Sequence, residues 1–245
     1  MTVHYTPKAA IPSLRVKQTL IHQCLFLLPL LCVVIALKTL EYSLDIPLAQ
    51  HFKTLRFQLP MVNMTMRIIS KYTSLLILGF YAYNLYRCYR QKKFTQLRFL
   101  FASLVVYYTL LSCTLYVLKV GVGMPRPYAE PSKITPFSFD SDYHSFPSGH
   151  TAECAAITST LAHFFNTYFA TFSLGCLLAM VAFSRVFCSM HHPLDLLPGA
   201  LLGSLAPLIA APLVHKRFWH RLPQSTFFTG TPPASSRPSS KKKAA

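Results

Sequence analysis

Residues 154–184 read CAAITSTLAHFFNTYFATFSLGCLLAMVAFS and contain no Asp, Glu, Lys or Arg. An α-helix rises about 1.5 Å per residue, so roughly 20 apolar residues cross the hydrocarbon core of a bilayer. A run of 31 uncharged residues is too long for one crossing and long enough for two short ones. We therefore expect two membrane-spanning helices, over 149–165 and 168–186, with the turn between them at Asn166-Thr167.

Apolar runs of similar length lie elsewhere in the chain. Stretches of 20 uncharged residues separate Lys17 from Lys38, Arg98 from Lys119, and Asp195 from Lys216. A further run over 68–86 is interrupted only by Lys71. These runs predict four more helices, over 19–38, 68–87, 99–119 and 194–214. Only 13% of the residues are charged, against about 25% in soluble domains. We predict an all-α polytopic membrane protein with six transmembrane helices, the first of them an uncleaved anchor.

The distribution of charge predicts which face is cytoplasmic. The chain has a net charge of +17, and basic residues without any acidic one occupy 1–18, 87–98 and 216–245. Cytoplasmic segments of membrane proteins carry the excess of Lys and Arg. We expect a cytoplasmic arm over 1–18, a six-helix domain over 19–215 and a disordered basic tail over 216–245, with both termini in the cytoplasm. Because the basic segments alternate with the spans, their expected partner is an anionic bilayer and not nucleic acid.

Two other features of the sequence bear on the fold. The outward connection over 45–66 mixes Lys53 and Arg56 with Phe52 and Leu55, which is typical of an interfacial helix; a plain loop is the alternative. The seven cysteines lie mostly inside apolar runs and form no Cys-x-x-Cys pair. They predict neither a disulfide framework nor a zinc site.

Three clusters of polar residues stand at the predicted outward face. They are Lys119 with Arg126-Pro127, then Pro147-Ser148-Gly149-His150, and then Ser184-Arg185 with His191 and Asp195. Ionisable residues at the edge of a membrane are costly, which makes them candidates for function.

The residue types in these clusters suit phosphoryl transfer. Lys119, Arg126 and Arg185 offer three cations to a group whose negative charge is spread over three oxygens. Ser148 and Gly149 stand at a predicted helix start, where backbone amides and the helix dipole attract an anion. The clusters therefore predict a phosphate site.

Two histidines and an aspartate supply the remaining chemistry. His191 can attack phosphorus through one ring nitrogen if its other nitrogen is held as a donor. Asp195, four residues later, can accept that hydrogen bond, fix the tautomer and stabilise the imidazolium. His150 can protonate the departing oxygen.

Together the clusters resemble the signature of the type 2 phosphatidic acid phosphatase superfamily, and every defining position matches in order across about residues 99–210. The resemblance implies a six-helix core, a phosphohistidine at His191, acid catalysis by His150, and no metal or cofactor. It also implies the phosphate ligands, which are Lys119, Arg126, Ser148, Gly149 and Arg185. The signature's spacings select His191 over its neighbour His192. Vanadium haloperoxidases share the signature but are soluble, and six spans argue against that branch.

The position of the clusters at the membrane surface favours a lipid phosphate substrate. In family terms, the run from Tyr143 to Thr151 is most similar to the lipid A phosphatases of bacterial inner membranes, so we expect lipid A 1-phosphate as substrate on the periplasmic side. Phosphatidylglycerophosphate and undecaprenyl diphosphate phosphatases are alternatives, as is a lipid-to-lipid phosphotransferase. Glu153, one turn after His150, is a candidate to raise the pKa of that acid or to contact a substrate hydroxyl; a polar packing role is the alternative. The loop over 140–144, with Asp140 and His144, is a candidate for headgroup selection or a plain solvated loop.

Overall fold

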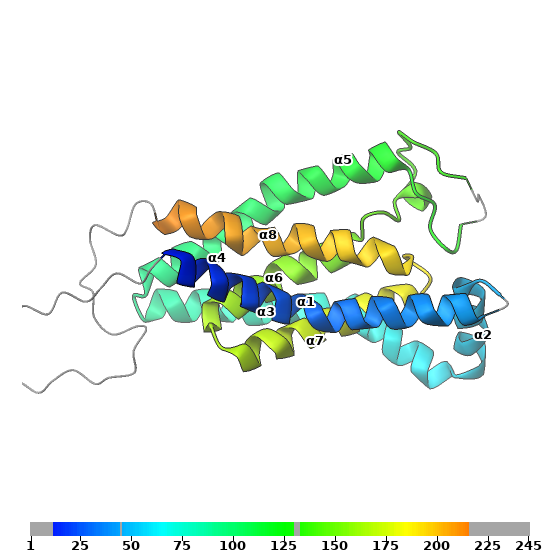
Figure 1. Ribbon diagram of the computed structural model, residues 1–245, viewed down its shortest axis with the longest axis horizontal. Coiled ribbons are helices and arrows are strands. Elements are labelled where there is room, and N and C mark those ends of the chain that lie inside the picture. The colour runs from blue at the N-terminus through cyan, green and yellow to red at the C-terminus, as the bar shows by residue number, and fades with distance from the viewer. Residues whose placement is uncertain (1–11, 45, 130–132, 216–245) are drawn as a thin grey trace, which may run out of the picture.

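The computed structural model describes residues 12–44, 46–129 and 133–215, and throughout these ranges the regular structure is helical, without a strand. The all-α prediction is thereby confirmed for the described residues. The helices are α1 (Pro12–Ser43), α2 (Leu48–Gln58), α3 (Pro60–Arg90), α4 (Phe94–Val106), α5 (Ser112–Val122), α6 (Gly149–Phe165), α7 (Tyr168–Phe187) and α8 (Leu196–His215), with short helical turns η1 (Tyr107–Leu111), η2 (Ser141–Tyr143) and η3 (Pro193–Asp195) (Figure 1).

Four helical stretches within the described residues are long and apolar enough to cross a membrane: Gln18–Ser43, Phe94–Val122, Tyr168–Phe187 and Pro193–Val214. Helices also cover the other two predicted spans, because α3 includes 68–87 and α6 coincides with 149–165. By length and composition alone these two do not qualify, since α6 has only 17 residues and α3 holds Lys71, Asn84 and several tyrosines. The number of crossings therefore stays a prediction.

Local sequence accounts for the ends of several helices. Asn166 adopts a left-handed conformation (φ 50°) and ends α6, while the Thr167 side chain accepts a hydrogen bond from the amide of Ala170 and begins α7; both are common helix-end chemistry. The turn predicted at these two residues is confirmed. α3 begins at Pro60, earlier than the predicted position 68, because proline suits the first turn of a helix and the polar turns that follow continue it.

The described part of the connection, residues 46–66, contains the helix α2, so it is not a plain loop, while its position in a membrane interface stays a prediction. Leu48 and Phe52 of α2 are buried, whereas Lys53 is exposed. The predicted helix over 99–119 is longer than expected and consists of α4, the wider π-helical turn η1 and α5. α1 already begins at Pro12, inside the predicted arm. The predicted tail over 216–245 lies outside the described residues.

α6 lies at the centre of the bundle and packs against α8, α7, α3 and α4. Every residue of α6 over 154–162 is buried. Two glycines let α8 approach α6 backbone to backbone. A Cβ on Gly203 would stand 2.0 Å from the carbonyl oxygen of Ala152, and one on Gly199 would stand 2.5 Å from that of Ser148. Small residues four positions apart allow this kind of close helix contact in membrane proteins.

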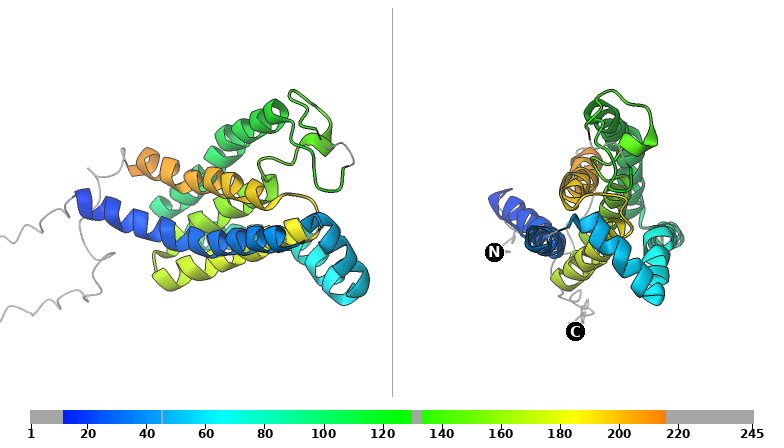
Figure 2. Two further views of the ribbon diagram at one scale, coloured as in Figure 1. Left: turned by 45° about the vertical axis from the view of Figure 1, so that its right-hand side comes forward. Right: turned by 90° about the vertical axis from the view of Figure 1, so that its right-hand side faces the viewer.

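The three polar clusters all lie at one end of the bundle. The end of α1, α2, the start of α3, the end of α5 and the connection from α7 to α8 gather there, whereas the start of α1 and the end of α8 lie at the opposite end (Figures 1 and 2). The described parts of the connection from α5 to α6, residues 123–129 and 133–148, are at the same end as the clusters. We call this the site end of the molecule.

Candidate active site

His191 lies in the connection between α7 and α8, with only 2% of its surface exposed. Its Nδ1 is 2.7 Å from the backbone carbonyl oxygen of Ser145. A carbonyl can only accept, so Nδ1 carries the proton and Nε2 keeps its lone pair. The imidazole is thus held in the tautomer that a nucleophile needs.

Asp195 does not accept the hydrogen bond that the sequence led us to expect. Its Oδ2 is 3.9 Å from Nδ1 of His191, beyond hydrogen-bond distance. The same oxygen accepts hydrogen bonds from Oγ of Ser145 at 2.5 Å and from the amide of His192 at 2.8 Å. The carbonyl of Ser145 already accepts the hydrogen bond from Nδ1 of His191. Asp195 therefore acts on the imidazole in two ways, through its hydrogen bond with Ser145 and through its nearby negative charge.

Ser145 is a site residue that sequence reasoning missed. It is fully buried, and its amide donates to the carbonyl of Met124, in the connection that carries Arg126. It therefore links the first cluster, through Met124, to the third, through Asp195 and His191. Its only signal in the sequence was a small polar residue directly before Phe146 and the second cluster.

Lys119 lies over the start of α6. Its Nζ donates to the carbonyl of His144 at 2.9 Å, and a Cβ on Gly149 would be 3.6 Å from its Cε. The amide of Ser148 is engaged, because it donates to the carbonyl of Asp195 at 3.0 Å, and its hydroxyl is 2.8 Å from that of Thr151. Ser148 therefore joins the second cluster to the third. The following amides of the first helical turn, beginning at Gly149, have no intrahelical partner and can receive an anion.

The two arginines reach the site from different elements. Arg185, at the end of α7, is nearly buried, and its Nη1 donates to Oγ of Ser70 on α3 at 2.7 Å. Arg126 places its Nη1 3.7 Å from the sulfur of Met190, the residue before His191. The charges of Arg185, Lys119 and Arg126 act on both His191 and His150. The structure thus brings all three predicted cations and both predicted histidines together.

The surroundings of His191 keep its imidazole neutral. Burial lowers the pKa of His191 well below its usual value near 6.5, and the charges of Arg185 and Lys119 lower that pKa further, while the hydrogen bond to Ser145 opposes them. A neutral imidazole has a free lone pair on Nε2. The group is therefore in its nucleophilic form at neutral pH.

His192 has a different environment from its neighbour. Its amide donates to Asp195, and its Nε2 is 3.2 Å from the carbonyl of Pro125. That contact ties His192 to the connection that carries Arg126. The geometry thus favours His191 over His192 as the nucleophile, in agreement with the spacing of the motif.

Two further groups can now be placed. Glu153 accepts a hydrogen bond from the hydroxyl of Tyr108, in η1, at 2.8 Å, so it joins α6 to the π-helical turn. The loop over 140–144 is held by its own contacts: Asp142 accepts from the hydroxyl of Tyr128 at 2.9 Å, and Nε2 of His144 is 2.9 Å from the carbonyl of Ser138. These contacts show what holds both groups, while a part in catalysis or in headgroup selection stays a prediction.

α2 supports the loop that carries His191. Arg56 reaches across from α2 and donates to the carbonyl of Phe187 and, at 2.9 Å, to the hydroxyl of Ser189. Cations are well suited to the carbonyls at the end of a helix, here α7. The contact of Arg56 was not predicted, since nothing in the spacing of the sequence connects residues 131 positions apart.

Comparison with known proteins agrees with this arrangement. A model of the PAP2 superfamily matches residues 100–219. These residues form a PAP2 superfamily domain. All three polar clusters lie within the PAP2 domain. Two of their contacts come from residues that precede it: Arg56 contacts the connection after α7, and Ser70 contacts Arg185.

Two curated relatives of the PAP2 domain are lipid phosphatases. The lipid A 1-phosphatase of Rhizobium etli is 32% identical over 100 residues, covering 39% of this chain and 42% of the relative. The lipid phosphate phosphatase delta of Arabidopsis thaliana is 30% identical over 102 residues, covering 36% of this chain and 24% of the relative. The chain thus spans less than half the length of these relatives. Among solved structures, the crystal structure of Aquifex aeolicus LpxE has a TM-score of 0.48 and 21% identity, covering 68% of this chain and 96% of that chain.

Proposed function

We propose that this protein is a lipid phosphatase that works without a metal and forms a phosphohistidine on His191. One observation carries the proposal. His191 is buried, its Nδ1 is bound to the carbonyl of Ser145, and the charges of three cations act on it. That arrangement presents a neutral nucleophile to a group that bears several negative charges.

The reaction follows from this arrangement in two steps. Nε2 of His191 attacks phosphorus; a P–N bond forms while the bond to the lipid oxygen breaks, and His150 gives a proton to that oxygen. Water then attacks the phosphohistidine while His150 takes its proton, and inorganic phosphate leaves with His191 restored. Lys119, Arg126, Arg185 and the first amides of α6 hold the phosphoryl oxygens in both steps. Asp195, through Ser145 and its own charge, stabilises the imidazolium.

We infer that the substrate is a lipid A 1-phosphate. The Rhizobium etli relative bears that activity in its name, and the site lies at one end of an apolar bundle, where a lipid headgroup would meet it. The Arabidopsis relative supports the broader class of lipid phosphates. A product assay with an added lipid acceptor separates hydrolysis from transfer of the phosphate to a second lipid.

The proposal includes six crossings, with α3 and α6 as the two that composition alone does not identify. α6 is enclosed by other helices, so its own hydropathy matters less than that of a helix facing lipid. Both ends of the described chain lie opposite the site end, and the segments next to them are basic. We therefore place the termini in the cytoplasm and the site on the periplasmic side of a bacterial inner membrane.

The test is phosphate release by the purified protein from lipid A, phosphatidylglycerophosphate, phosphatidate and undecaprenyl diphosphate, each with excess chelator. We expect activity on lipid A that the chelator leaves unchanged, and loss of at least a thousandfold in His191→Ala, since removing a nucleophile typically costs that much or more. His192→Ala is the matched control and should retain activity. Full activity in His191→Ala, or activity only with added divalent metal, would contradict the mechanism.

A further inference from the structure

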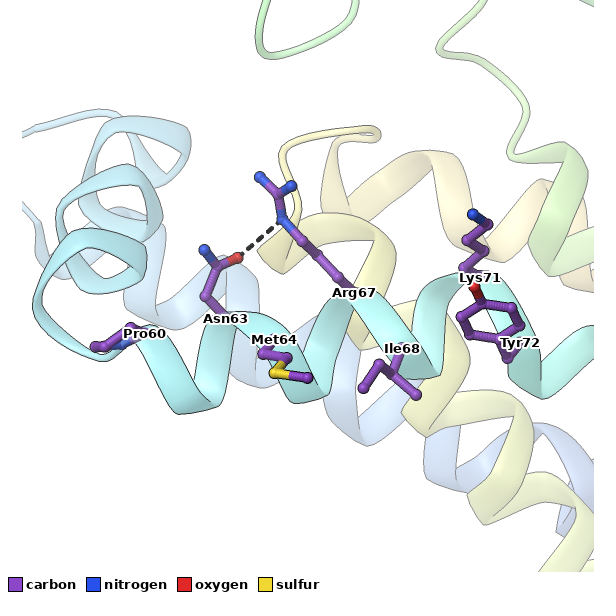
Figure 3. A pocket seen from close by; sticks show the side chains of 7 residues that line it. All are labelled: Pro60, Asn63, Met64, Arg67, Ile68, Lys71 and Tyr72. Atoms are coloured by element: carbon purple, nitrogen blue, oxygen red, sulfur yellow. Dashed lines mark hydrogen bonds between the residues drawn. The ribbon is translucent and has the colours of Figure 1, made fainter.

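The part of α3 at the site end carries a polar stripe that the proposed reaction does not use. Asn63, Arg67 and Lys71 are four residues apart and therefore share one face of the helix. They line a groove of about 370 Å³ together with Pro60, Met64, Ile68 and Tyr72 (Figure 3).

The two cations of this groove have no acidic partner among the described residues. Nε of Arg67 donates to Oδ1 of Asn63 at 3.1 Å, and Nζ of Lys71 is 5.3 Å from the centre of the Tyr72 ring. Lys38 and Glu41 form an ion pair on α1, and no ion pair within the described ranges includes Arg67 or Lys71. Both charges of the groove are therefore available to a ligand.

The groove adjoins the active site. Ser70, between Arg67 and Lys71 in the sequence, accepts the hydrogen bond from Arg185. The charge of Arg67 also acts on Arg56 and Cys188, at the connection that leads to His191. A single helical turn of α3 thus contacts a phosphate-binding arginine and displays two further cations beside it.

The lining of the groove selects the kind of ligand. Arg67 and Lys71 suit an anion, and Met64, Ile68 and Tyr72 beside them suit an apolar chain. A lipid that is already bound through one phosphate would bring both kinds of group to this place. A soluble anion would gain nothing from the apolar part of the lining.

We propose that this groove is a second anion subsite, which binds a further phosphate of the same lipid whose first phosphate lies at His191. The inference rests on the proposed function and narrows it, because it selects lipids with two separated phosphates over lipids with one. Arg67 and Lys71 contribute to binding and take no part in bond breaking.

The test measures binding without turnover. Full-length His191→Ala protein in detergent is titrated with lipid A that carries both phosphates and with lipid A that carries only the 1-phosphate. We expect the added changes Arg67→Gln and Lys71→Gln to weaken binding of the doubly phosphorylated lipid about tenfold, since two partly exposed charge contacts are each worth up to about a threefold to fivefold change. Binding of the singly phosphorylated lipid should be unchanged.

Lys53→Gln is the matched control, because it removes an exposed cation of α2 at the same end of the molecule, and it should alter neither affinity. An equal loss for both lipids would show general attraction to anionic surfaces and overturn the subsite, as would no loss for either. Phosphate release by the wild-type protein is measured in parallel. Its absence would overturn the proposed function while the binding comparison still decides the subsite.

Discussion

At the scale of single residues, Ser145 orients His191 with its backbone carbonyl and contacts Asp195 with its hydroxyl. Ser145 thus makes two contacts that matter, one through its carbonyl and one through its Oγ. Any residue at this position would supply the carbonyl. The hydroxyl additionally donates a hydrogen bond to the carboxylate of Asp195, which is 2% exposed, and alanine could not replace that donor.

Ser145→Ala should therefore slow catalysis while leaving substrate binding intact. Loss of a hydrogen bond to a buried charge costs roughly 1.5–3 kcal/mol, so we expect kcat to fall about tenfold to a hundredfold with KM unchanged. Without this donor the buried carboxylate holds its negative charge less well, so it stabilises the imidazolium less and the pKa of His191 falls. Since the neutral imidazole is the active form, the acidic limb of kcat/KM should move to lower pH.

Ser204→Ala is the control for Ser145→Ala. Ser204 is a buried serine of α8 whose hydroxyl donates to the carbonyl of Leu201 in its own helix. Its removal should change neither kcat nor the pH profile. A fall in kcat for Ser145→Ala with an unmoved acidic limb would indicate a purely structural role.

The motif residues and Ser145 differ in how far the sequence could reveal them. His191, Lys119, Arg185 and His150 were predicted because their chemistry needs particular side chains at characteristic spacings, and the structure brings them together. Ser145 acts on His191 through its backbone, which leaves no mark on residue type. The direct contact expected for Asp195 was wrong for the same reason, since a backbone carbonyl took its place.

At the scale of helices, the contact between α6 and α8 determines how the second and third clusters meet. Gly203→Ala would place a methyl group 2.0 Å from the carbonyl oxygen of Ala152. Forcing extra atoms into such a contact costs about 1–3 kcal/mol, and we expect the midpoint of thermal unfolding in detergent to fall by roughly 3–10 °C.

Gly79→Ala is the matched control for this substitution. Gly79 lies inside α3, and a Cβ there would have no atom within 4 Å. Alanine favours a helix over glycine by about 0.5–1 kcal/mol, so the midpoint should stay or rise slightly. A similar fall in both variants would show that the close contact of Gly203 is unimportant.

Hydropathy predicted the existence of the long helices better than their limits. The segment over 68–87 was found as part of α3, but the helix extends back to Pro60 because proline suits its first turn and residues such as Met64 and Arg67 favour a helix outside the apolar core as well. The π-helical turn at Tyr107–Leu111 was not predicted. A π-helical turn is wider than the α-helical turn of 3.6 residues and changes how the side chains pack. It needs no change in composition, so an apolar run does not reveal it.

At the scale of the whole molecule, the charge distribution predicts a defined orientation in the membrane. In a protein whose seven cysteines are replaced by alanine, a single cysteine at Ser141 should react with a membrane-impermeant maleimide added outside intact cells. Gln91→Cys is the matched control, because Gln91 is also exposed and follows α3 at the end away from the site. It should react only after lysis. The reverse pattern would invert the orientation proposed from the basic segments.

The enclosure of α6 has a consequence for biogenesis. A translocating machinery meets each segment before its neighbours have packed, and α6, with 17 residues and buried threonines and a serine at its centre, is a poor independent substrate for insertion. α7 follows after a two-residue turn and qualifies by length and hydropathy. In the proposed arrangement of six crossings, the two helices are therefore expected to enter the bilayer as one hairpin, so that synthesis of α7 commits His150 to its side of the membrane.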